Sequence, residues 1–289
     1  MPFAIPDSDL MRLVREDVPY GDITTTGLGI AAQPGRATFT AATDMTIACI
    51  EDAARMLELC DCRCTRHSSS GATVRRDALL LEGSGLAGNL HRAGKTAQIL
   101  LELASGIATR AAAIVTAARS ANPRVSVACT RKHMPGAKRI ALRAIMAGGA
   151  VPHRLGLSDS VLVFADHRIF LAGGANLTDA FQRLRGHAPE RRLSAEADSE
   201  EEALALVEAG VDVVQIDKAT PESVARLAAA FRTCLPRPLL AAAGGINETN
   251  APAFAAAGAD LLVTSAPYYA MPRDVKLRMS KVMESDGSL

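Results

Sequence analysis

The sequence predicts an α/β protein in two parts, a layered α+β domain followed by a run of βα units. Its 289 residues are enough for two domains. From about residue 121, strand-like and helix-like patterns alternate with a period of roughly 20 to 25 residues, which is typical of βα units. Apolar residues make up 48% of the chain and are mainly Ala, Leu and Val, whereas aromatic residues make up only 3%. This composition suits helices that pack on a parallel sheet.

The N-terminal third mixes strand and helix patterns, as expected for an α+β layer domain. A compact polar segment follows the first helix, and it is either a surface turn or a loop held by a partner such as another subunit. The predicted elements are a helix at 7–15, the polar segment 16–25, a strand pair within 35–50, a helix at 51–59, strands at 62–69 and 72–83, and a long helix at 90–118 that is interrupted near Ser105-Gly106.

The rest of the chain alternates short apolar strands with helix signals. Ser199 begins a capping box, Thr220-Pro221 places an N-cap before a proline, and Asn247 is expected to cap a helix that ends near Gly258. Repeated units of this kind build either an open parallel sheet or a closed barrel. The predicted strands are 125–129, 161–164, 192–196, 211–216, 238–242 and 260–264.

The last four strands lead into residues that favour chemistry. In order, these are Glu196, Asp217, Gly244-Gly245 and Ser265. In a barrel such strand ends share one mouth, where active sites are built, so the barrel is favoured. The carboxylates could hold Mg²⁺ with phosphate oxygens, or stabilise positive charge on a sugar, and the glycine turn before a helix could bind phosphate. The alternatives are solvated loop acids and a plain βα turn.

Cationic side chains gather in the stretch 130–167. Arg131 and Lys132 follow one predicted strand, and His153 and Arg154 follow the next helix. Arginine can bind carboxylate or phosphate through two parallel hydrogen bonds, whereas lysine binds as a point charge. A lone basic pair is usually surface, but four such groups at the ends of neighbouring elements predict an anionic ligand.

The overall charge balance argues against polyanionic partners. Lys and Arg number 32 and Asp and Glu 31, so neither nucleic acid nor an anionic membrane is an expected partner. The sequence has no evident leader and no apolar run of membrane-spanning length, which predicts a soluble cytoplasmic protein. The six cysteines are then expected to be reduced thiols. A soft-metal site at Cys60, Cys62 and Cys64, on one face of a strand, is the less favoured alternative.

Motifs along nearly the whole chain match those of one enzyme family in the same order. They are Glu16–Thr25 (EDVPYGDITT), Ser105–Thr109 (SGIAT), Thr130-Arg131-Lys132 with Pro135-Gly136, Gly148-Gly149 with His153–Asp159 (HRLGLSD), Asp217 and Gly244-Gly245. The chain therefore resembles the type II phosphoribosyltransferases of the quinolinate phosphoribosyltransferase family.

The resemblance implies a fold and an assembly. An N-terminal α/β sandwich would cover residues 1–114 and be rejoined by the C-terminal tail 271–289, and an incomplete TIM-like α/β barrel would cover 115–270. The family forms homodimers, with higher assembly left open, in which the N-terminal domain of one chain covers the barrel mouth of the other. This arrangement would give the segment 16–25 and Lys95 a role in the partner's active site.

The resemblance also implies a reaction. The family joins 5-phosphoribosyl 1-diphosphate to the ring nitrogen of a pyridine dicarboxylate, releases diphosphate and decarboxylates the product. The implied catalytic residues are Lys132, which would bind the phosphoribosyl diphosphate, and Glu196 and Asp217, which would lie near the ribose and its Mg²⁺. The implied substrate-binding residues are Lys95, Arg131, His153, Arg154 and the position of Phe164. The implied 5-phosphate pocket consists of Gly244, Gly245 and Ser265.

The chain departs from the family pattern around the acceptor. Phe164 replaces a lysine, and Asp166 replaces an asparagine. Lys95 replaces an arginine, Ala241-Ala242-Ala243 replaces Glu-Ala-Ser, and Tyr269 takes the place of a histidine near the last strand end. With an apolar ring at position 164, the second carboxylate of quinolinate would be buried without a partner, at a cost of roughly several kcal/mol.

These departures, with the stretches GKTAQ, TRKHMPG and VLVFADH, most resemble the ModD branch of the family, whose members are labelled pyrophosphorylases and associated with molybdenum-transport loci. They favour a phosphoribosyltransferase for an acidic nitrogen heterocycle less charged than quinolinate. Two alternatives stay open. One is a genuine quinolinate phosphoribosyltransferase of NAD synthesis, and the other is a non-catalytic ligand-binding or regulatory protein linked to molybdenum uptake.

Overall fold

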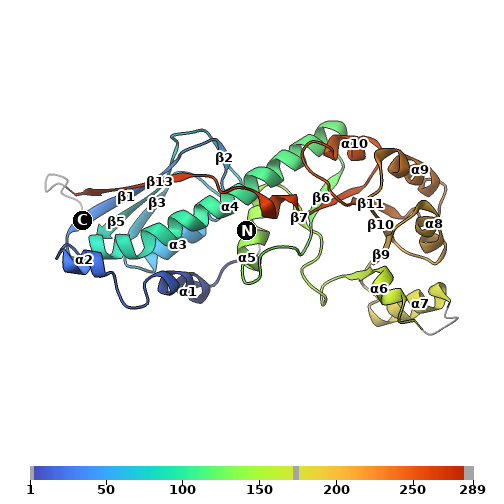
Figure 1. The fold of residues 1–289 in the computed structure, drawn as a ribbon, viewed down its shortest axis with the longest axis horizontal. Coiled ribbons are helices and arrows are strands. Elements are labelled where there is room, and N and C mark those ends of the chain that lie inside the picture. The colour runs from blue at the N-terminus through green and yellow to red at the C-terminus, as the bar shows by residue number, and fades with distance from the viewer. Residues whose placement is uncertain (1–2, 172–175, 283–289) are drawn as a thin grey trace. The chain divides into compact units, whose positions relative to one another are not determined.

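The computed structural model describes residues 3–171 and 176–282, which form two compact units. The first unit comprises the chain up to residue 112, the segment 134–149 and the stretch from 269 onward. The second unit comprises 113–133 and 150–268. Figure 1 colours the chain by residue number and labels helices and strands where there is room.

The first unit contains an antiparallel sheet with the strand order β13-β1-β5-β3. Alternate residues of β1, Ala37, Phe39 and Ala41, are buried, as the two-residue period of a strand requires. The predicted pairing within 35–50 is wrong, because β1 pairs with β5 and β13 while β2 pairs with β4. The strands are β1 (Pro34–Ala41), β2 (Met45–Thr46), β3 (Arg63–Arg66), β4 (Thr73–Val74), β5 (Leu79–Leu86) and β13 (Val275–Lys281).

Helices pack their apolar sides into the core of this unit. In α3 (Ile50–Glu58) the buried side chains Ile50, Ala53 and Leu57 recur every three to four residues, which places them on one face. The predicted helix at 7–15 is confirmed as α1 (Asp7–Asp17). Within the polar segment that follows, Asp22 caps the short helix α2 (Ile23–Gly27), because its carboxylate accepts a hydrogen bond from the Thr25 amide at 3.0 Å.

The long helix α4 (Ala87–Ala121) runs without the predicted break at Ser105-Gly106. These small residues serve close packing instead. The Ser105 hydroxyl accepts a hydrogen bond from the Ala48 amide at 3.2 Å, and a Cβ on Gly106 would lie 2.5 Å from the Met271 carbonyl oxygen. The helix is long and apolar enough to cross a membrane by composition, but half of its most apolar window is buried inside the protein. It is therefore described as a core helix.

Helix α5 (Lys138–Ala147) belongs to the first unit, although the expected division assigned 115–270 to the barrel. The physical reason is a buried ion pair. The Arg143 guanidinium is 5% exposed and lies 2.8 Å from the carboxylate of Asp52, which is 6% exposed. Burial raises the pKa of Asp52 even though Arg143 opposes the shift. Removal of either partner would leave a buried charge, which costs about 3–5 kcal/mol.

The CDCRC segment is not a continuous strand. Cys60 and Cys62 are buried and precede β3, and only Cys64 lies within that strand. Burial raises the pKa of Cys62 to about 11 and that of Cys64 to about 12, so these thiols stay protonated at neutral pH. Within residues 3–171 and 176–282, no group of three or more His, Cys, Asp or Glu side chains could hold a metal ion.

The second unit is a curled parallel sheet with the strand order β7-β6-β12-β11-β10-β9-β8. All the pairings along it are parallel, and within the described residues β7 and β8 are its two edges, so the barrel is incomplete. The predicted α/β class with an incomplete TIM-like barrel is confirmed. The strands are β6 (Ser126–Cys129), β7 (Val151–Pro152), β8 (Val161–Val163), β9 (Leu193–Ala197), β10 (Val213–Asp217), β11 (Leu239–Ala243) and β12 (Leu261–Thr264).

Helices cover the outer face of this sheet (Figure 1). Outward residues such as Val214, Leu240 and Leu262 are fully buried. Ser199 caps α8 and Thr220 caps α9, as predicted. The Asn247 prediction is wrong, because its side chain closes a turn and α10 begins at Ala251. The helices are α6 (Ala165–Arg168), α7 (Leu177–His187), α8 (Glu200–Glu208), α9 (Pro221–Phe231) and α10 (Ala251–Ala256), and the 3-10 turn η1 (Ala266–Tyr269) follows β12.

Candidate active site

The predicted catalytic acids lie at the carboxyl ends of two strands of the second unit's sheet. Glu196 is the penultimate residue of β9, and Asp217 is the last residue of β10. The register pairs Glu196 with Gln215, so Glu196, Gln215 and Asp217 project from the same face. This is the inner face, since the neighbouring residues with the opposite parity pack under the helices.

The environment of Glu196 holds its proton more tightly than usual. Burial is the main reason that the pKa of Glu196 is raised, and the nearby carboxylates of Asp217 and Asp198 add to the effect. A hydrogen bond from the Gln215 amide and the charge of Lys132 act in the opposite direction. A cation placed between Glu196 and Asp217 would relieve their repulsion.

The two carboxylates fit Mg²⁺ only with help from a ligand. A magnesium ion commonly takes one or two protein carboxylates and completes its shell with phosphate oxygens and water. Glu196 and Asp217 supply that minimum. The Lys218 ammonium lies 3.5 Å from an Asp217 carboxylate oxygen and is a competing partner at the same place. The pair therefore suits a metal that arrives with a diphosphate.

Basic residues follow the carboxyl ends of two further strands of the same sheet. Arg131 and Lys132 follow β6, and His153 and Arg154 follow β7. The pKa of Arg154 is lowered, first by burial and then by the nearby charge of Arg131, while Glu196 opposes the shift. The guanidiniums of Arg131 and Arg154 thus lie close enough to repel each other. Two repelling cations beside two repelling carboxylates form a site that a ligand with an anionic group would stabilise.

His153 is a neutral member of this group rather than a cation. Its amide donates a hydrogen bond to the Cys129 carbonyl at 2.8 Å, which fixes the end of β7 beside β6. The pKa of His153 is lowered to about 4, first because its ring is buried and second because Arg154 lies nearby. At neutral pH the imidazole can donate or accept a hydrogen bond but carries no charge.

Phe164 forms an apolar wall beside the cations. It follows β8 and precedes α6. The centre of its ring lies 5.3 Å from the guanidinium carbon of Arg154, and the ring stacks on His167 at a centroid distance of 5.7 Å. The Arg154 charge is thus supported by the face of an aromatic ring. Asp166 and His167 belong to the short helix α6.

The glycine turn after β11 has an open backbone. Gly244 and Gly245 both have positive φ, at 90° and 71°. A Cβ on Gly244 would lie 2.5 Å from the Lys218 amide nitrogen, whereas a Cβ on Gly245 would meet nothing within 4 Å. The side-chain amides of Asn247 and Asn250 each donate to the Gly245 carbonyl at 3.1 Å, and together they fix the turn. The expected helix start directly after the glycines is replaced by this asparagine-braced loop.

Ser265 joins the ends of β12 and β6. Its hydroxyl lies 2.6 Å from the Thr130 hydroxyl, and the Tyr268 hydroxyl donates to the Thr130 carbonyl at 3.0 Å. Burial raises the pKa of Tyr268, so its phenol remains a donor. Tyr269 was expected in place of a family histidine at this end, but the residue that contacts Thr130 is Tyr268. The Tyr268 ring meets the His133 ring edge to face.

Lys95 and the other predicted residues fall in different units. Lys95 lies on α4 in the first unit, where its ammonium donates to the Gln98 side chain at 3.1 Å. The residues brought to one sheet edge in the second unit are Arg131, Lys132, His153, Arg154, Phe164, Glu196, Asp217, Gly244, Gly245 and Ser265. A role for Lys95 beside them stays a prediction.

Gln215 and Lys218 lie at this site but were not predicted as site residues from the sequence. Gln215 is a polar side chain within the apolar strand β10, and it is only 5% exposed. Lys218 follows that strand in a left-handed conformation with φ of 53°, which is uncommon for a residue with a side chain. A polar residue within an apolar run was the available sequence signal for Gln215. The conformation of Lys218 has no such signal.

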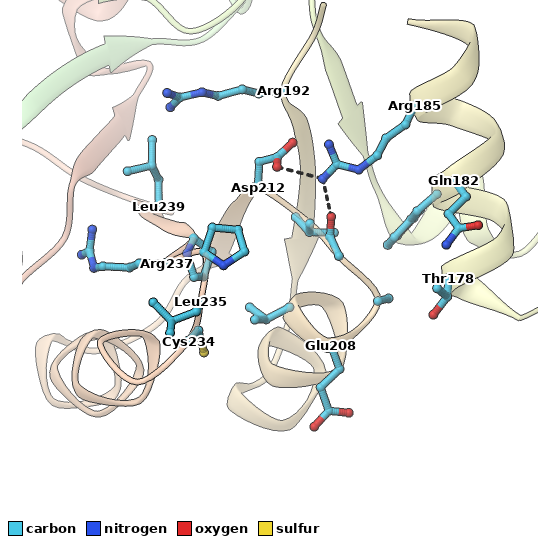
Figure 2. A pocket seen from close by; sticks show the side chains of 17 residues that line it. Thr178, Gln182, Arg185, Arg192, Glu208, Asp212, Cys234, Leu235, Arg237 and Leu239 are labelled. Carbon is cyan, nitrogen blue, oxygen red and sulfur yellow. Dashed lines mark hydrogen bonds and ion pairs between the residues drawn. The ribbon is translucent and has the colours of Figure 1, made fainter. Parts of the chain in front are cut away.

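A cavity of about 620 Å³ lies at the opposite end of the same strands. Figure 2 shows its lining residues, with Arg185 directed at Asp212 and Arg237 on the other side. Arg185 lies 2.8 Å from Asp212, so part of the charge is neutralised within the protein. None of the predicted site residues lines this cavity. In barrel enzymes, the amino end of the strands serves stability and the carboxyl end carries the chemistry.

Comparison with known proteins decides the family. The model for the quinolinate phosphoribosyl transferase C-terminal domain matches residues 107–278, and the model for the N-terminal domain matches residues 22–105. The chain belongs to the quinolinate phosphoribosyl transferase family. This confirms the resemblance drawn from the motifs, and it identifies the chain as a member of a family of phosphoribosyltransferases.

Within the quinolinate phosphoribosyl transferase family, the chain is more similar to ModD proteins than to the nicotinate-nucleotide enzymes found. It is 48% identical over 250 residues to the "Putative pyrophosphorylase ModD" of Rhodobacter capsulatus, with 86% of this chain and 95% of that protein covered. It is 30% identical over 274 residues to the "Probable nicotinate-nucleotide pyrophosphorylase [carboxylating]" of Synechocystis, with 94% and 91% covered. The predicted ModD-like branch is confirmed.

Solved structures share the fold of this family member. The nicotinate-nucleotide pyrophosphorylase from Francisella tularensis superimposes with a TM-score of 0.86 at 22% identity, covering 96% of this chain and 98% of that one. NadC from Streptococcus pyogenes superimposes with a TM-score of 0.87 at 23% identity, covering 96% and 97%. At these identities the likeness establishes the fold alone.

Two of the family departures now have a location. In β11 the residues Ala241 and Ala243 lie on the inner face, because Gln215 is paired with Ala241 and Asp217 with Ala243. Ala242 faces the helices. The positions where the quinolinate phosphoribosyl transferase pattern has Glu and Ser are therefore methyl groups on the inner face. Together with Val263 they form a small apolar cluster.

Proposed function

We propose that this protein transfers a phosphoribosyl group from 5-phosphoribosyl 1-diphosphate to the ring nitrogen of an acidic heterocycle. The bond between C1 of the ribose and the diphosphate oxygen breaks, and its electron pair leaves with diphosphate. The ring nitrogen supplies the pair for the new bond to C1. The observation that carries the proposal is the placement of two arginines and two carboxylates at the carboxyl ends of strands in one sheet. They are Arg131, Arg154, Glu196 and Asp217.

The residues divide the reaction between them. Arg131 and Arg154 bind the acidic group of the acceptor, and neutral His153 adds a hydrogen bond. Lys132 offsets charge on the departing diphosphate. A bound Mg²⁺, held by Glu196 and Asp217 with phosphate oxygens, would neutralise further charge on the diphosphate. The same carboxylates stabilise the positive charge that develops on the ribose.

The 5-phosphate is assigned to the loop after β11 and to Ser265. The Gly245 backbone is open to approach, since a Cβ there would meet nothing within 4 Å. Backbone amides in such a turn can bind an anion without any side chain. Ser265 adds a hydroxyl from the neighbouring strand end, where it is held by Thr130.

The acceptor is proposed to carry fewer carboxylates than quinolinate. Phe164 supplies an apolar ring, and Ala241 and Ala243 supply methyl groups on the inner face. A second carboxylate against this surface would have no cationic partner and would lose the greater part of its hydration. For this reason a genuine quinolinate phosphoribosyltransferase is the less favoured function.

Dimerisation is proposed as part of this function. Tyr20 is 96% exposed, Ile23 is 85% exposed and Leu28 is 67% exposed, all in or beside the polar segment. On α4, Ile99 and Leu103 are exposed at four-residue spacing from Lys95, which places the three on one face of the helix. Apolar side chains exposed in this way favour an interface. A cytoplasmic location remains part of the same proposal.

Calorimetry with 5-phosphoribosyl 1-diphosphate and Mg²⁺, followed by a diphosphate-release assay against a panel of acidic heterocycles, tests the function. We expect metal-dependent binding and release with at least one monoacid acceptor, and slower release with quinolinate. Binding without release from any acceptor would favour a ligand-binding or regulatory protein. Absence of binding would contradict the proposed enzyme.

A further inference from the structure

Gln215 has a buried oxygen that nothing in the described protein satisfies. The residue is 5% exposed on the inner face of β10. Its Nε2 donates a hydrogen bond to a carboxylate oxygen of Glu196. Its Oε1 is buried and has no hydrogen-bond partner within residues 3–171 and 176–282. A buried acceptor without a partner is unfavourable and calls for an explanation.

The orientation of the amide follows from the chemistry of its partner. An ionised carboxylate only accepts hydrogen bonds, so the amide must turn its nitrogen towards Glu196. The carbonyl oxygen then points away from Glu196. The opposite orientation would place two oxygens against each other. The free Oε1 is therefore the consequence of the Glu196 contact rather than of an arbitrary choice between nitrogen and oxygen.

The neighbouring strand cannot supply the missing donor. Gln215 is paired with Ala241 across β10 and β11, and Ala243 and Val263 complete the adjacent surface. Their side chains carry no polar hydrogen. The backbone amides of β10 and β11 are committed to the parallel ladder between them. Within residues 3–171 and 176–282 no group donates to Oε1, and a ligand bound on the inner face can supply the donor.

We infer that Gln215 determines acceptor specificity by accepting a hydrogen bond from an N–H or O–H group on the acceptor ring. The inference rests on the proposed transferase function. Gln215 lies two residues before Asp217 on the same strand, deeper in the sheet than the carboxylate assigned to the ribose. The acceptor would then combine an acidic group, bound by Arg131 and Arg154, with a ring hydroxyl, amino or lactam N–H donor.

The test compares nicotinate with the series of its ring-hydroxylated derivatives in wild type and in Gln215→Leu. Leucine keeps the volume but removes the acceptor oxygen. We expect the wild type to favour one hydroxylated acid over nicotinate by about 10²-fold in kcat/KM, because a site built for a donor rejects an analogue without it. In Gln215→Leu this preference should fall to about threefold or less. The variant also removes the hydrogen bond to Glu196, so the readout is the ratio of kcat/KM for the two acids, in which a shared effect on 5-phosphoribosyl 1-diphosphate cancels.

Gln98→Leu is the matched thermal control, since Gln98 is a buried glutamine whose amide is fully used. It donates to Glu102 and to the Val275 carbonyl and accepts from Lys95. Its loss should lower Tm by more than the loss of Gln215, whose oxygen is unpaired. An equal or larger loss of Tm in Gln215→Leu would contradict the claim that the Gln215 Oε1 has no hydrogen-bond partner. If that variant fails to fold, Gln215→Met replaces it in the kinetic test.

The kinetic outcomes separate the inference from the function beneath it. Diphosphate release by the wild type with no preference for any hydroxylated acid would overturn the role of Gln215 and leave the transferase intact. A preference that survives in Gln215→Leu would do the same. A raised KM for 5-phosphoribosyl 1-diphosphate with an unchanged preference between the acids would limit Gln215 to its contact with Glu196 and overturn the acceptor assignment. Absence of release with every acid would instead overturn the transferase.

Discussion

The two ends of the second unit's strands differ in how their charged side chains are paired. At the amino end, Asp212 lies 2.8 Å from Arg185 and accepts from the Leu193 amide at 2.7 Å. At the same end, Asp260 lies 3.0 Å from Arg237 and accepts from the Leu240 amide at 2.9 Å. Both of these carboxylates have a cation and a backbone donor. Burial opposes the effect, but the contacts with Arg185 and Leu193 lower the pKa of Asp212.

At the carboxyl end, groups of like charge lie near each other, although Lys218 also lies 3.5 Å from Asp217. Burial and Asp217 raise the pKa of Glu196, whereas burial and Arg131 lower the pKa of Arg154. In each case burial and a nearby like charge destabilise the charged form of the side chain. The same strands therefore have a closed end, where carboxylates are paired, and an open end, where the reaction is proposed to take place. Substitutions at the two ends should separate stability from activity.

The largest effect is expected for Asp217→Asn. Loss of the carboxylate should remove Mg²⁺-dependent binding of 5-phosphoribosyl 1-diphosphate and lower kcat about 10²–10³-fold, the range for loss of one electrostatic stabiliser. Tm should change little, because the residue's charge partner, Lys218, is largely exposed. Asp179→Asn, an exposed acid on α7, is the control for loss of one negative charge. Unchanged turnover in Asp217→Asn would contradict its role.

A smaller effect is expected for Phe164→Lys. The new ammonium would pair with a second carboxylate, so quinolinate turnover should rise about 10- to 100-fold, which is the value of one charge-assisted hydrogen bond. Phe164→Leu keeps the wall apolar and should give no gain. Diphosphate release with quinolinate measures both. A similar gain from leucine would show that ring size rather than charge had blocked the dicarboxylate.

At the closed end, Asp212→Asn should affect stability alone. The amide keeps the shape but weakens the contacts with Arg185 and Leu193, so the free energy of unfolding should fall by about 1–2 kcal/mol. Urea unfolding measures this change, and the diphosphate-release assay should show wild-type turnover. A tenfold loss of turnover with unchanged unfolding would mean that the cavity in Figure 2 takes part in the reaction.

The smallest effect concerns pH and His153. The folded protein keeps this ring neutral down to a pKa of about 4, whereas the unfolded chain takes up a proton near the ordinary pKa of 6.5. Wild-type stability should therefore fall as pH drops from about 6.5 to about 4, by about 1 kcal/mol at pH 5 after allowance for solvent screening. His153→Gln should lack this part of the fall. Parallel pH profiles for the two proteins would contradict the buried neutral ring.

The sequence predicted the strand ends well because their signals are local. Short apolar runs and helix caps positioned Glu196, Asp217 and the glycine turn within one or two residues of their observed places. The long-range features were missed. The break predicted at Ser105-Gly106 is filled by contacts with residues far along the chain, and α5 joins the first unit through the buried Arg143.

The chemistry of the site was predicted less completely than its location. Burial makes His153 neutral, and burial cannot be inferred from two letters in a loop. Gln215 became informative only when the register placed Glu196 on one side and Ala241 on the other. The unpaired oxygen is a property of three neighbouring strands, and no one of them encodes it alone.

Gly244 and Lys218 are in close contact at the carboxyl end of the strands. Lys218 donates its amide hydrogen to the Ala243 carbonyl at 3.0 Å, and Gly244 lacks room for even one additional carbon beside it. The loops after β10 and β11 are therefore held together by a hydrogen bond and by close packing. The separation between the Asp217 carboxylate and the glycine turn is therefore fixed within the protein. A ribose 5-phosphate bound as proposed, with C1 near Asp217 and the phosphate at the glycine turn, would meet two binding groups at a fixed separation. The two loops would not move independently.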